Sequence, residues 1–389
     1  MKAGIAARVS RRLRSIEDAV RPGAAMERNA RGLLFHRASS LAASAAITAG
    51  VPTQATADSA LATRIISAYQ RAHAAELGES MWKMFFSEYH RPLHQALLEG
   101  NPTTIAAILA NPADSDLFYG FDILTRTFAG AFRSKGTRLA YARLCLDGLV
   151  RLAESAAALP MDNPETWRAQ LATRRDTEGV LNALRVSRPP FSIPNPFPNE
   201  HGLASSLGVI SYRVPQALYQ AWRVQQLVEH VSNPSVLEIG AGLGRTAHYA
   251  HELGIKDYTI VDIPITATAQ AYFLGRTLGA VNVLLDGEAP TDTSKKLRII
   301  SPQTFLSEDK QYDLIVNVDS LPEMDIGVAS AYWNKIKGST STFLSINHEA
   351  NAFRVHDLIS ADSRRLNVHR GLYWMRRGYT EELIRLTPA

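Results

Sequence analysis

Three glycines at alternate positions follow a short apolar run and form the most informative chemical pattern in the sequence. The segment reads Val236-Leu237-Glu238-Ile239-Gly240-Ala241-Gly242-Leu243-Gly244-Arg245. Glycine suits such a turn because it allows a sharp bend and lets a ligand lie against the backbone without a Cβ. A strand that enters a glycine turn before a helix is typical of nucleotide-cofactor sites. We therefore expect Gly240, Gly242 and Gly244 to bind a cofactor.

The spacing of these glycines separates two classes of cofactor. A dinucleotide fingerprint, G-x-G-x-x-G, needs glycine or alanine at position 245, where this chain has Arg245. The pattern G-x-G-x-G, with Glu238 two residues before the first glycine, resembles instead motif I of class I S-adenosylmethionine-dependent methyltransferases. The resemblance implies that the turn faces the methionine part of the cofactor and that Glu238 helps to position it. An NAD-binding oxidoreductase is the alternative from another class.

A second carboxylate follows the next apolar run, which ends Val261-Asp262-Ile263. A carboxylate can accept hydrogen bonds from both ribose hydroxyls, so Asp262 is the residue type expected at the ribose of either cofactor. We expect the adenine beside Ile263 and the turn Pro302-Gln303-Thr304, and we count Gln303, Thr304 and Asn317 among the cofactor-binding residues.

The elements that must position these residues alternate between strand and helix from residue 235 onward. Apolar or β-branched runs predict strands at Ser235–Ile239, Tyr258–Val261, Leu297–Ser301, Asp313–Val318 and Ser341–Ile346. Helical stretches separate them, at Arg245–Leu253, Ala267–Leu278 and Gly327–Lys337. Such a series predicts an α/β fold with a doubly wound, mostly parallel Rossmann-like sheet and with ligands at the carboxyl ends of its strands.

The rest of the chain divides by composition. Residues 56–187 show helical periodicity and predict an α-helical domain, 188–200 form a proline-rich linker, and 201–389 form the cofactor-binding domain. Residues 1–55 are predicted to be a basic, flexible arm, since the first 37 residues hold nine basic and three acidic side chains.

Charge and cysteine content exclude several functions. The remaining residues hold 33 basic and 34 acidic side chains, so no nucleic-acid-binding surface is expected on the folded body. The single cysteine excludes a disulfide framework. No apolar run approaches the ~18 residues of a membrane span. We therefore predict a cytoplasmic protein without a transmembrane segment, and any homo-oligomer would form through the helical domain.

The resemblance becomes narrower towards the C-terminus. Asp262-Ile263-Pro264, the pattern Asn317-x-x-Ser320-x-x-Glu323-Met324 and Ile346-Asn347-His348-Glu349 are similar to the sugar O-methyltransferase family of bacteria, over roughly residues 199–375. The resemblance implies a class I methyltransferase fold, S-adenosylmethionine as cofactor, and a sugar hydroxyl of a polysaccharide or glycosylated natural product as acceptor.

Four residues are candidates for catalysis on the acceptor side. Asp319, His348 and Glu349 follow adjacent predicted strands, and His201 lies in the loop before the core. His348 is the predicted base, since histidine titrates near neutrality and Glu349 or Asp319 could orient it. A structural role as helix cap is equally open for Asp319 and for Glu323. Arg213, Tyr212 and Arg245 are further candidates for the cofactor or acceptor wall, and solvated or cation–π surface roles are the alternative.

No specific motif for a metal is present. Oxygen ligands from Asp319, Glu323 and Glu349 would suit Mg²⁺, but no spacing demands it. The predicted function is therefore methyl transfer from S-adenosylmethionine to a sugar hydroxyl. The alternatives are an O-methyltransferase of a non-sugar small molecule and a non-catalytic partner protein with the same fold.

Overall fold

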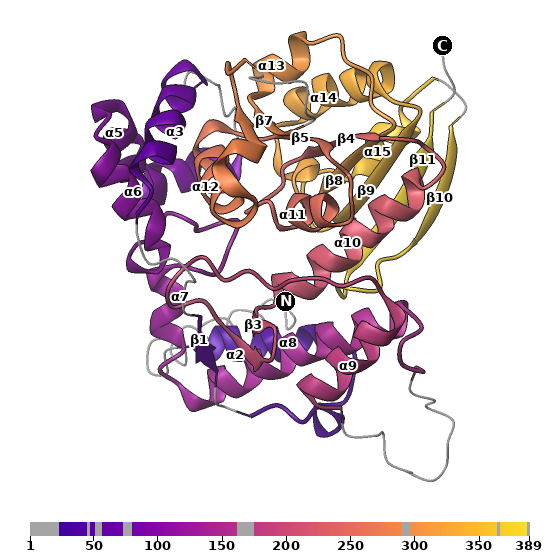
Figure 1. Cartoon of the computed structure of the whole chain (residues 1–389). Coiled ribbons are helices and arrows are strands. Elements are labelled where there is room, and N and C mark those ends of the chain that lie inside the picture. The colour runs from indigo at the N-terminus through magenta and orange to yellow at the C-terminus, as the bar shows by residue number, and fades with distance from the viewer. Residues whose placement is uncertain are drawn as a thin grey trace, which may run out of the picture.

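The computed structural model describes residues 23–44, 47–50, 57–72, 80–161, 175–289, 296–363 and 366–386. Its centre is an eight-stranded sheet in the order β10-β11-β9-β8-β4-β5-β7-β6 (Figure 1). The strands are β4 (Ser235–Ile239), β5 (Asp257–Val261), β6 (Val283–Leu285), β7 (Leu297–Ile300), β8 (Leu314–Val318), β9 (Thr342–His348), β10 (Asn367–Leu372) and β11 (Tyr379–Arg385).

Seven of these strands run parallel, and β11 alone is antiparallel to its neighbours β9 and β10. The order reverses at β4, because β5 lies on one side of this strand and β8 on the other. Such a switch point leaves a crevice at the carboxyl ends of the strands. The prediction of an α/β, doubly wound and mostly parallel sheet is confirmed.

Both faces of the sheet are covered by helices. One apolar core joins alternate strand residues, such as Val236 and Leu314, to α10–α12, and a second core joins Leu237 and Ile315 to α13–α15. This alternation follows from the two-residue period of a strand. The helices are α10 (Arg213–Val228), α11 (Arg245–Glu252), α12 (Pro264–Leu274), α13 (Pro302–Ser307), α14 (Ile326–Ser339) and α15 (Val355–Ser360).

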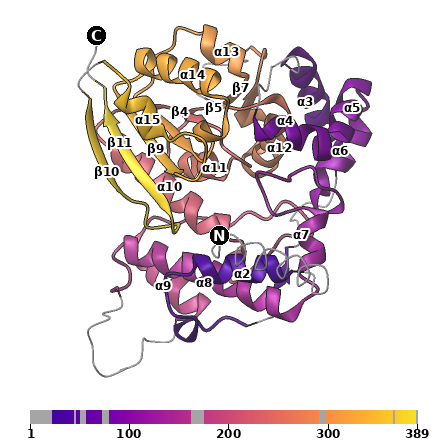
Figure 2. The ribbon, with the colours of Figure 1, turned by 180° about the vertical axis from the view of Figure 1, so that it is seen from behind.

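The N-terminal region is helical, as predicted, and its helices form two groups on two sides of the sheet domain, one beside α12 and the other next to α10 (Figures 1 and 2). Its helices are α2 (Ala24–Leu33), α3 (Ser59–Ala72), α4 (Met81–Phe85), α5 (Arg91–Glu99), α6 (Pro102–Ala110), α7 (Arg126–Ala131), α8 (Lys135–Ser155) and α9 (Thr177–Ser187). A π-helical turn, Phe86–His90, joins α4 to α5. Helix α3 packs on α12 and α8 packs on α10.

The predicted domain boundaries fall within one continuous core. Leu61 and Leu146 of the helical region belong to the same apolar cluster as Val236 and Tyr272. The predicted linker 188–200 is packed as well, since the fully buried Phe197 contacts the rings of Phe118 and Tyr272. Proline density excludes regular structure here, but it does not prevent side chains from being buried.

The prediction of a flexible arm over residues 1–55 is wrong for residues 23–44 and 47–50, whereas residues 1–22 lie outside the described residues. Helix α2 packs on α8 and buries Ala24, Glu27 and Ala30. Strand β1 (Thr48–Ala49) pairs with β2 (His201–Ser205), and β2 also pairs with β3 (Gly208–Ile210). The excess of basic residues in this region favours the prediction of a flexible arm, although only one narrow face of α2 is buried and its other residues are free to be charged. Among the described residues, we find no helix with the length and apolar character needed to cross a membrane.

Candidate active site

The glycine turn lies at the switch point of the sheet, directly after β4. Gly240, Gly242 and Gly244 all have positive φ, at 72°, 57° and 86°. A Cβ on Gly240 would lie 2.2 Å from the side chain of Ser320, so only glycine fits there. Gly244 begins α11, and a Cβ at this position would press on Leu274 of α12 at 3.0 Å. Glycine at positions 240 and 244 therefore lets the turn lie close to the loop that carries Ser320 and to α12.

Two buried carboxyl groups flank this turn. Glu238 is 2% exposed and accepts a hydrogen bond from Tyr258 at 2.9 Å. Burial raises its pKa to about 7, because the charged form loses its hydration. Asp262 follows β5 and accepts hydrogen bonds from the backbone N–H groups of Ala241 (3.1 Å) and Ile263 (2.8 Å). Burial raises the pKa of Asp262 to about 7 as well.

The turn and these carboxyl groups line one end of a cavity of about 290 Å³. This volume is near the lower end of the range of about 300–1,000 Å³ that is typical of small-molecule sites. The predicted cofactor residues that line it are Glu238, Gly240, Gly242, Asp262 and Ile263.

The other end of the cavity is lined by charged groups from three segments. Asp319, directly after β8, has φ 66° and accepts a hydrogen bond from Arg376 Nη1 at 2.5 Å. Glu323 lies one turn later and accepts a hydrogen bond from Trp82 Nε1 of α4 at 3.2 Å. Burial, and then the negative charge of Asp319, raise the pKa of Glu323 to about 8. Arg213 lines the same end.

Two polar atoms of the Asp319–Arg376 pair have no hydrogen-bond partner among the described residues. They are Oδ1 of Asp319 and Nε of Arg376, and both are buried. Buried polar atoms are nearly always paired, so an acceptor and a donor left free beside a cavity are what a polar ligand would satisfy.

His348 lines the cavity at the end of β9, but it is not paired with a carboxylate as predicted. Its Nδ1 accepts a hydrogen bond from the backbone N–H of Ala350 at 3.2 Å. Glu349 instead forms an ion pair with Arg370 at 2.7 Å, and Asp319 is engaged by Arg376. Neighbouring side chains diverge at the end of this strand, so adjacency in sequence does not bring the two groups together.

Five other predicted residues do not line the cavity, and one of them is Gly244, the last glycine of the turn. His201 on β2 stacks on Phe132, with 4.4 Å between ring centroids. Thr304 Oγ1 donates to Asp286 at 2.8 Å, and Gln303 is exposed on α13, although their neighbour Pro302 lines the cavity. Asn317 is fully buried and donates to the carbonyl of Ile239 at 3.0 Å, which ties β8 to the start of the glycine turn.

Several lining residues were not found from the sequence. Trp82, Phe121, Arg376 and Tyr379 come from α4, from the loop before α7 and from the β10–β11 region, and none belongs to a recognisable motif. For Arg245, the sequence suggests only a place in the wall of the site. It is 7% exposed and forms ion pairs with Asp122 and with Glu200, the latter at 2.9 Å, so it holds two N-terminal segments against α11.

The residues considered for a metal are not brought together, because Glu349 pairs with Arg370 outside the cavity lining. Among the described residues, no group of three or more His, Cys, Asp or Glu side chains is arranged to hold a metal ion.

Comparisons with known proteins give distant structural likenesses. No protein-family model and no curated protein matches the chain. Magnesium protoporphyrin IX methyltransferase (ChlM) from Synechocystis PCC 6803 with bound SAM is 14% identical, with 44% of this chain and 81% of that chain covered and a TM-score of 0.32. The glycopeptide N-methyltransferase MtfA, complexed with S-adenosyl-L-homocysteine, is 14% identical, with 44% and 90% covered and a TM-score of 0.33. The methyltransferase domain of bacterial CtHen1-C is 12% identical, with 44% and 100% covered and a TM-score of 0.33.

The chain has a Rossmann-like fold, with a doubly wound and mostly parallel sheet. Strand β11 is antiparallel and lies between β9 and β10, and the glycine turn lies at the switch point. The fold was predicted correctly, together with the helices that precede it.

Proposed function

We propose that this protein transfers the methyl group of S-adenosylmethionine to a hydroxyl of a sugar unit in a polysaccharide or glycosylated natural product. The observation that supports this most is the shared cavity. A glycine turn with two buried carboxyl groups lines one end, and a separate set of charged and aromatic side chains lines the other. A donor and an acceptor could thus meet within one enclosure.

The residues at the first end fit the cofactor. Gly240 and Gly242 leave the backbone open to a ligand, and Glu238 and Asp262 have raised pKa values because burial removes water without supplying a cation. S-adenosylmethionine carries positive charge and ribose hydroxyls, which would stabilise both carboxylates. When bound, it supplies an electrophilic methyl group on a sulfonium. The residues of this end would bind and orient it.

The chemistry at the second end is removal of a proton from the acceptor hydroxyl. A positioned base contributes roughly 10²–10⁴-fold, and it works best with a pKa near the working pH. In neutral His348, Nδ1 accepts the Ala350 N–H, so the proton is on Nε2 and no lone pair is free. We therefore propose Glu323, whose pKa is raised to about 8, as the base in place of His348.

The Asp319–Arg376 pair would orient the acceptor. A hydroxyl can donate to Asp319 Oδ1 and accept from Arg376 Nε, which are the two unpaired buried atoms. A neighbouring pair of hydroxyls, as a sugar ring presents, would use both at once. The resemblance of residues 317–324 to the sugar O-methyltransferase family supports the same class of acceptor.

The test is methyl transfer from isotope-labelled S-adenosylmethionine to a panel of sugar nucleotides, glycans and glycosylated natural products, with hydroxylated non-sugar compounds beside them. We expect label in a sugar O-methyl ether, and we expect S-adenosylhomocysteine to raise the melting temperature while NAD does not. Asp262→Ala is the matched control with weakened cofactor binding. Label only in non-sugar acceptors would refute the sugar class, and stabilisation by NAD alone would refute the cofactor.

Cytoplasmic location and self-association through the helical region stay predictions. We also keep a glycan or small molecule, and no nucleic acid, as the proposed acceptor.

A further inference from the structure

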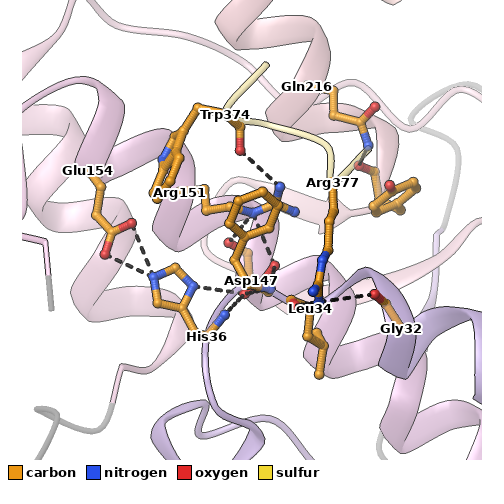
Figure 3. A network of polar contacts seen from close by, with 11 residues as sticks. Gly32, Leu34, His36, Asp147, Arg151, Glu154, Gln216, Trp374 and Arg377 are labelled. Atoms are coloured by element: carbon orange, nitrogen blue, oxygen red, sulfur yellow. Dashed lines mark hydrogen bonds and ion pairs between the residues drawn. The ribbon is translucent and has the colours of Figure 1, made fainter. Parts of the chain in front are cut away.

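A short N-terminal segment contacts the turn 373–378 from more than 300 residues away in the sequence. Residues 32–37, which we call the strap, begin in the last turn of α2, which ends at Leu33, and contact both α8 and the turn 373–378 that joins β10 to β11 (Figure 3). Arg377 Nη1 of this turn donates to the carbonyl of Leu34 at 3.4 Å. The strap therefore contacts the segment that carries Arg376.

His36 anchors the strap to α8 through both of its ring nitrogens. Nδ1 lies 2.8 Å from Asp147 Oδ1, and Nε2 lies 2.9 Å from Glu154 Oε1. Burial alone would lower the pKa of His36, but hydrogen bonds to these two carboxylates and their charges raise it to about 9. The His36 side chain is 10% exposed, against 0% and 1% for its partners. It is thus a buried imidazolium held by two acids.

Arg151 connects this cluster to the turn. Its Nε forms an ion pair with Asp147 at 3.0 Å, and its Nη1 donates to the carbonyl of Trp374 at 3.1 Å. Its guanidinium lies 4.5 Å from the ring centroid of Phe35, and that ring packs against Trp374 at 5.1 Å. Phe35 and Arg151 together hold the backbone and side chain of Trp374.

The turn held in this way supplies the acceptor end of the cavity. Arg376, two residues after Trp374, binds Asp319 at 2.5 Å and lies over the ring of Tyr379, with 4.1 Å to its centroid. Both Arg376 and Tyr379 line the cavity. The turn is closed by a hydrogen bond from Tyr373 N–H to the carbonyl of Tyr379 at 2.9 Å.

We propose that the strap is a positioning element for the acceptor side of the site, in which His36 and Arg151 fix the turn 373–378 and thereby the Arg376–Asp319 pair. His36 is a positioning residue, because its backbone N–H and its ring bind the carboxylates of Asp147 and Glu154 and it does not line the cavity. The inference rests on the proposed function for its catalytic meaning. The physical link between strap and turn does not depend on the acceptor.

The first test measures hydrogen exchange and needs no acceptor. The variants are His36→Gln, a chain that lacks residues 1–37, and a matched chain that lacks only residues 1–22 and keeps the strap. His248→Gln, a buried histidine that faces Glu252 on α11, controls for loss of a paired histidine elsewhere. Loss of a charge-assisted hydrogen bond should speed exchange at Tyr373 and Tyr379 by about 10–100-fold in the first two chains. The two controls should exchange there as the full chain does.

The second test separates positioning from general loss of structure. We expect His36→Gln to bind S-adenosylhomocysteine within about threefold of the full chain, while kcat/KM for the acceptor identified by the screen falls about tenfold or more. Unchanged exchange over 373–379 in both His36→Gln and the chain without residues 1–37 would overturn the proposal, as would an equal loss of S-adenosylhomocysteine affinity. If the full chain does not bind S-adenosylhomocysteine, the proposed cofactor fails, whereas the exchange result still decides the link between strap and turn.

Discussion

Asp262 gives the sharpest test of the cofactor assignment, because its partners are known individually. Its carboxylate accepts hydrogen bonds from Ala241 N–H (3.1 Å), Ile263 N–H (2.8 Å) and Gln270 Nε2 (2.5 Å). Asp262→Ala removes the acceptor for these donors and the acceptor proposed for the ribose. A hydrogen bond to a charged group contributes about 1.5–3 kcal/mol, which corresponds to a loss of affinity of about 10–150-fold.

Stability separates the two effects of this substitution. The pKa of Asp262 is raised to about 7, above its unfolded value, so the carboxyl group adds most stability when it is protonated in the folded state. This contribution is lost as the pH rises towards 7. Asp262→Ala should therefore cost more stability at pH 5.5 than at pH 8, as measured by chemical denaturation.

Isothermal titration calorimetry with S-adenosylhomocysteine at pH 8 measures the affinity directly. Asp286→Ala is the matched control, since Asp286 also follows a strand, β6, but it accepts from Thr304 and does not line the cavity. We expect its affinity to stay within about twofold of the unmodified chain. An Asp262→Ala variant that binds as tightly as the unmodified chain would show that this carboxylate does not contact the ligand, and the proposed orientation of the cofactor would be wrong.

Three further predictions concern the rest of the cavity. Glu323→Gln should lower turnover by about 10²-fold or more and abolish the rise in rate towards pH 8, whereas His348→Ala and His201→Ala should keep that rise; a loss confined to His348→Ala in pH–rate profiles would restore the histidine as base. Gly240→Ala should destabilise the fold by about 1–3 kcal/mol, because its Cβ would meet Ser320 at 2.2 Å and φ is 72°, and the double variant with Ser320→Gly should recover part of this loss in thermal unfolding. The free protein should lose stability as the pH rises from 6.5 to 8.5. The pKa values of Glu238, Glu323 and His36 are raised in the folded state, so the folded state binds more protons than the unfolded state in this range. Constant denaturation midpoints across this range would contradict these pKa values.

The parts of the fold that the sequence predicted are those with local patterns. The β4 strand, the glycine turn and Asp262 lie within 30 residues of one another, and period and residue type suffice to place them. The β10–β11 hairpin was missed because its outer strand, β10, is largely exposed and lacks a long apolar run. The packed strap was missed because His36 and Phe35 are held by α8 residues more than 100 positions away.

The acceptor side of the cavity was still harder to predict, because it is built from contacts between residues that are far apart in the sequence. Asp319 and Glu323 could be singled out because they follow a predicted strand, but their pairing depends on Arg376 and Trp82, which come from opposite ends of the chain. The predicted orientation of His348 by Glu349 or Asp319 is not observed, because Glu349 pairs with Arg370 and Asp319 pairs with Arg376. Contacts between residues far apart in the sequence, rather than motifs, therefore decide which acidic group or histidine on the acceptor side can accept a proton.

This division has a consequence for how the site would acquire specificity. The cofactor end is built from β4 and β5 and the turns after them, whereas the acceptor end needs α4, the turn 373–378 and, behind that turn, the strap. Changes in α4 or in the strap should therefore alter which acceptor is used before they alter cofactor binding. Trp82 is the clearest case, because it belongs to α4, far from the sheet in the sequence, and its Nε1 donates a hydrogen bond to Glu323. Its substitution by phenylalanine keeps an aromatic ring but removes the donor, which should raise the pKa of Glu323 further and move the rising limb of the pH–rate profile to higher pH. S-adenosylhomocysteine affinity should not change. A profile that shifts to lower pH would show that the Trp82 hydrogen bond does not stabilise the ionised carboxylate.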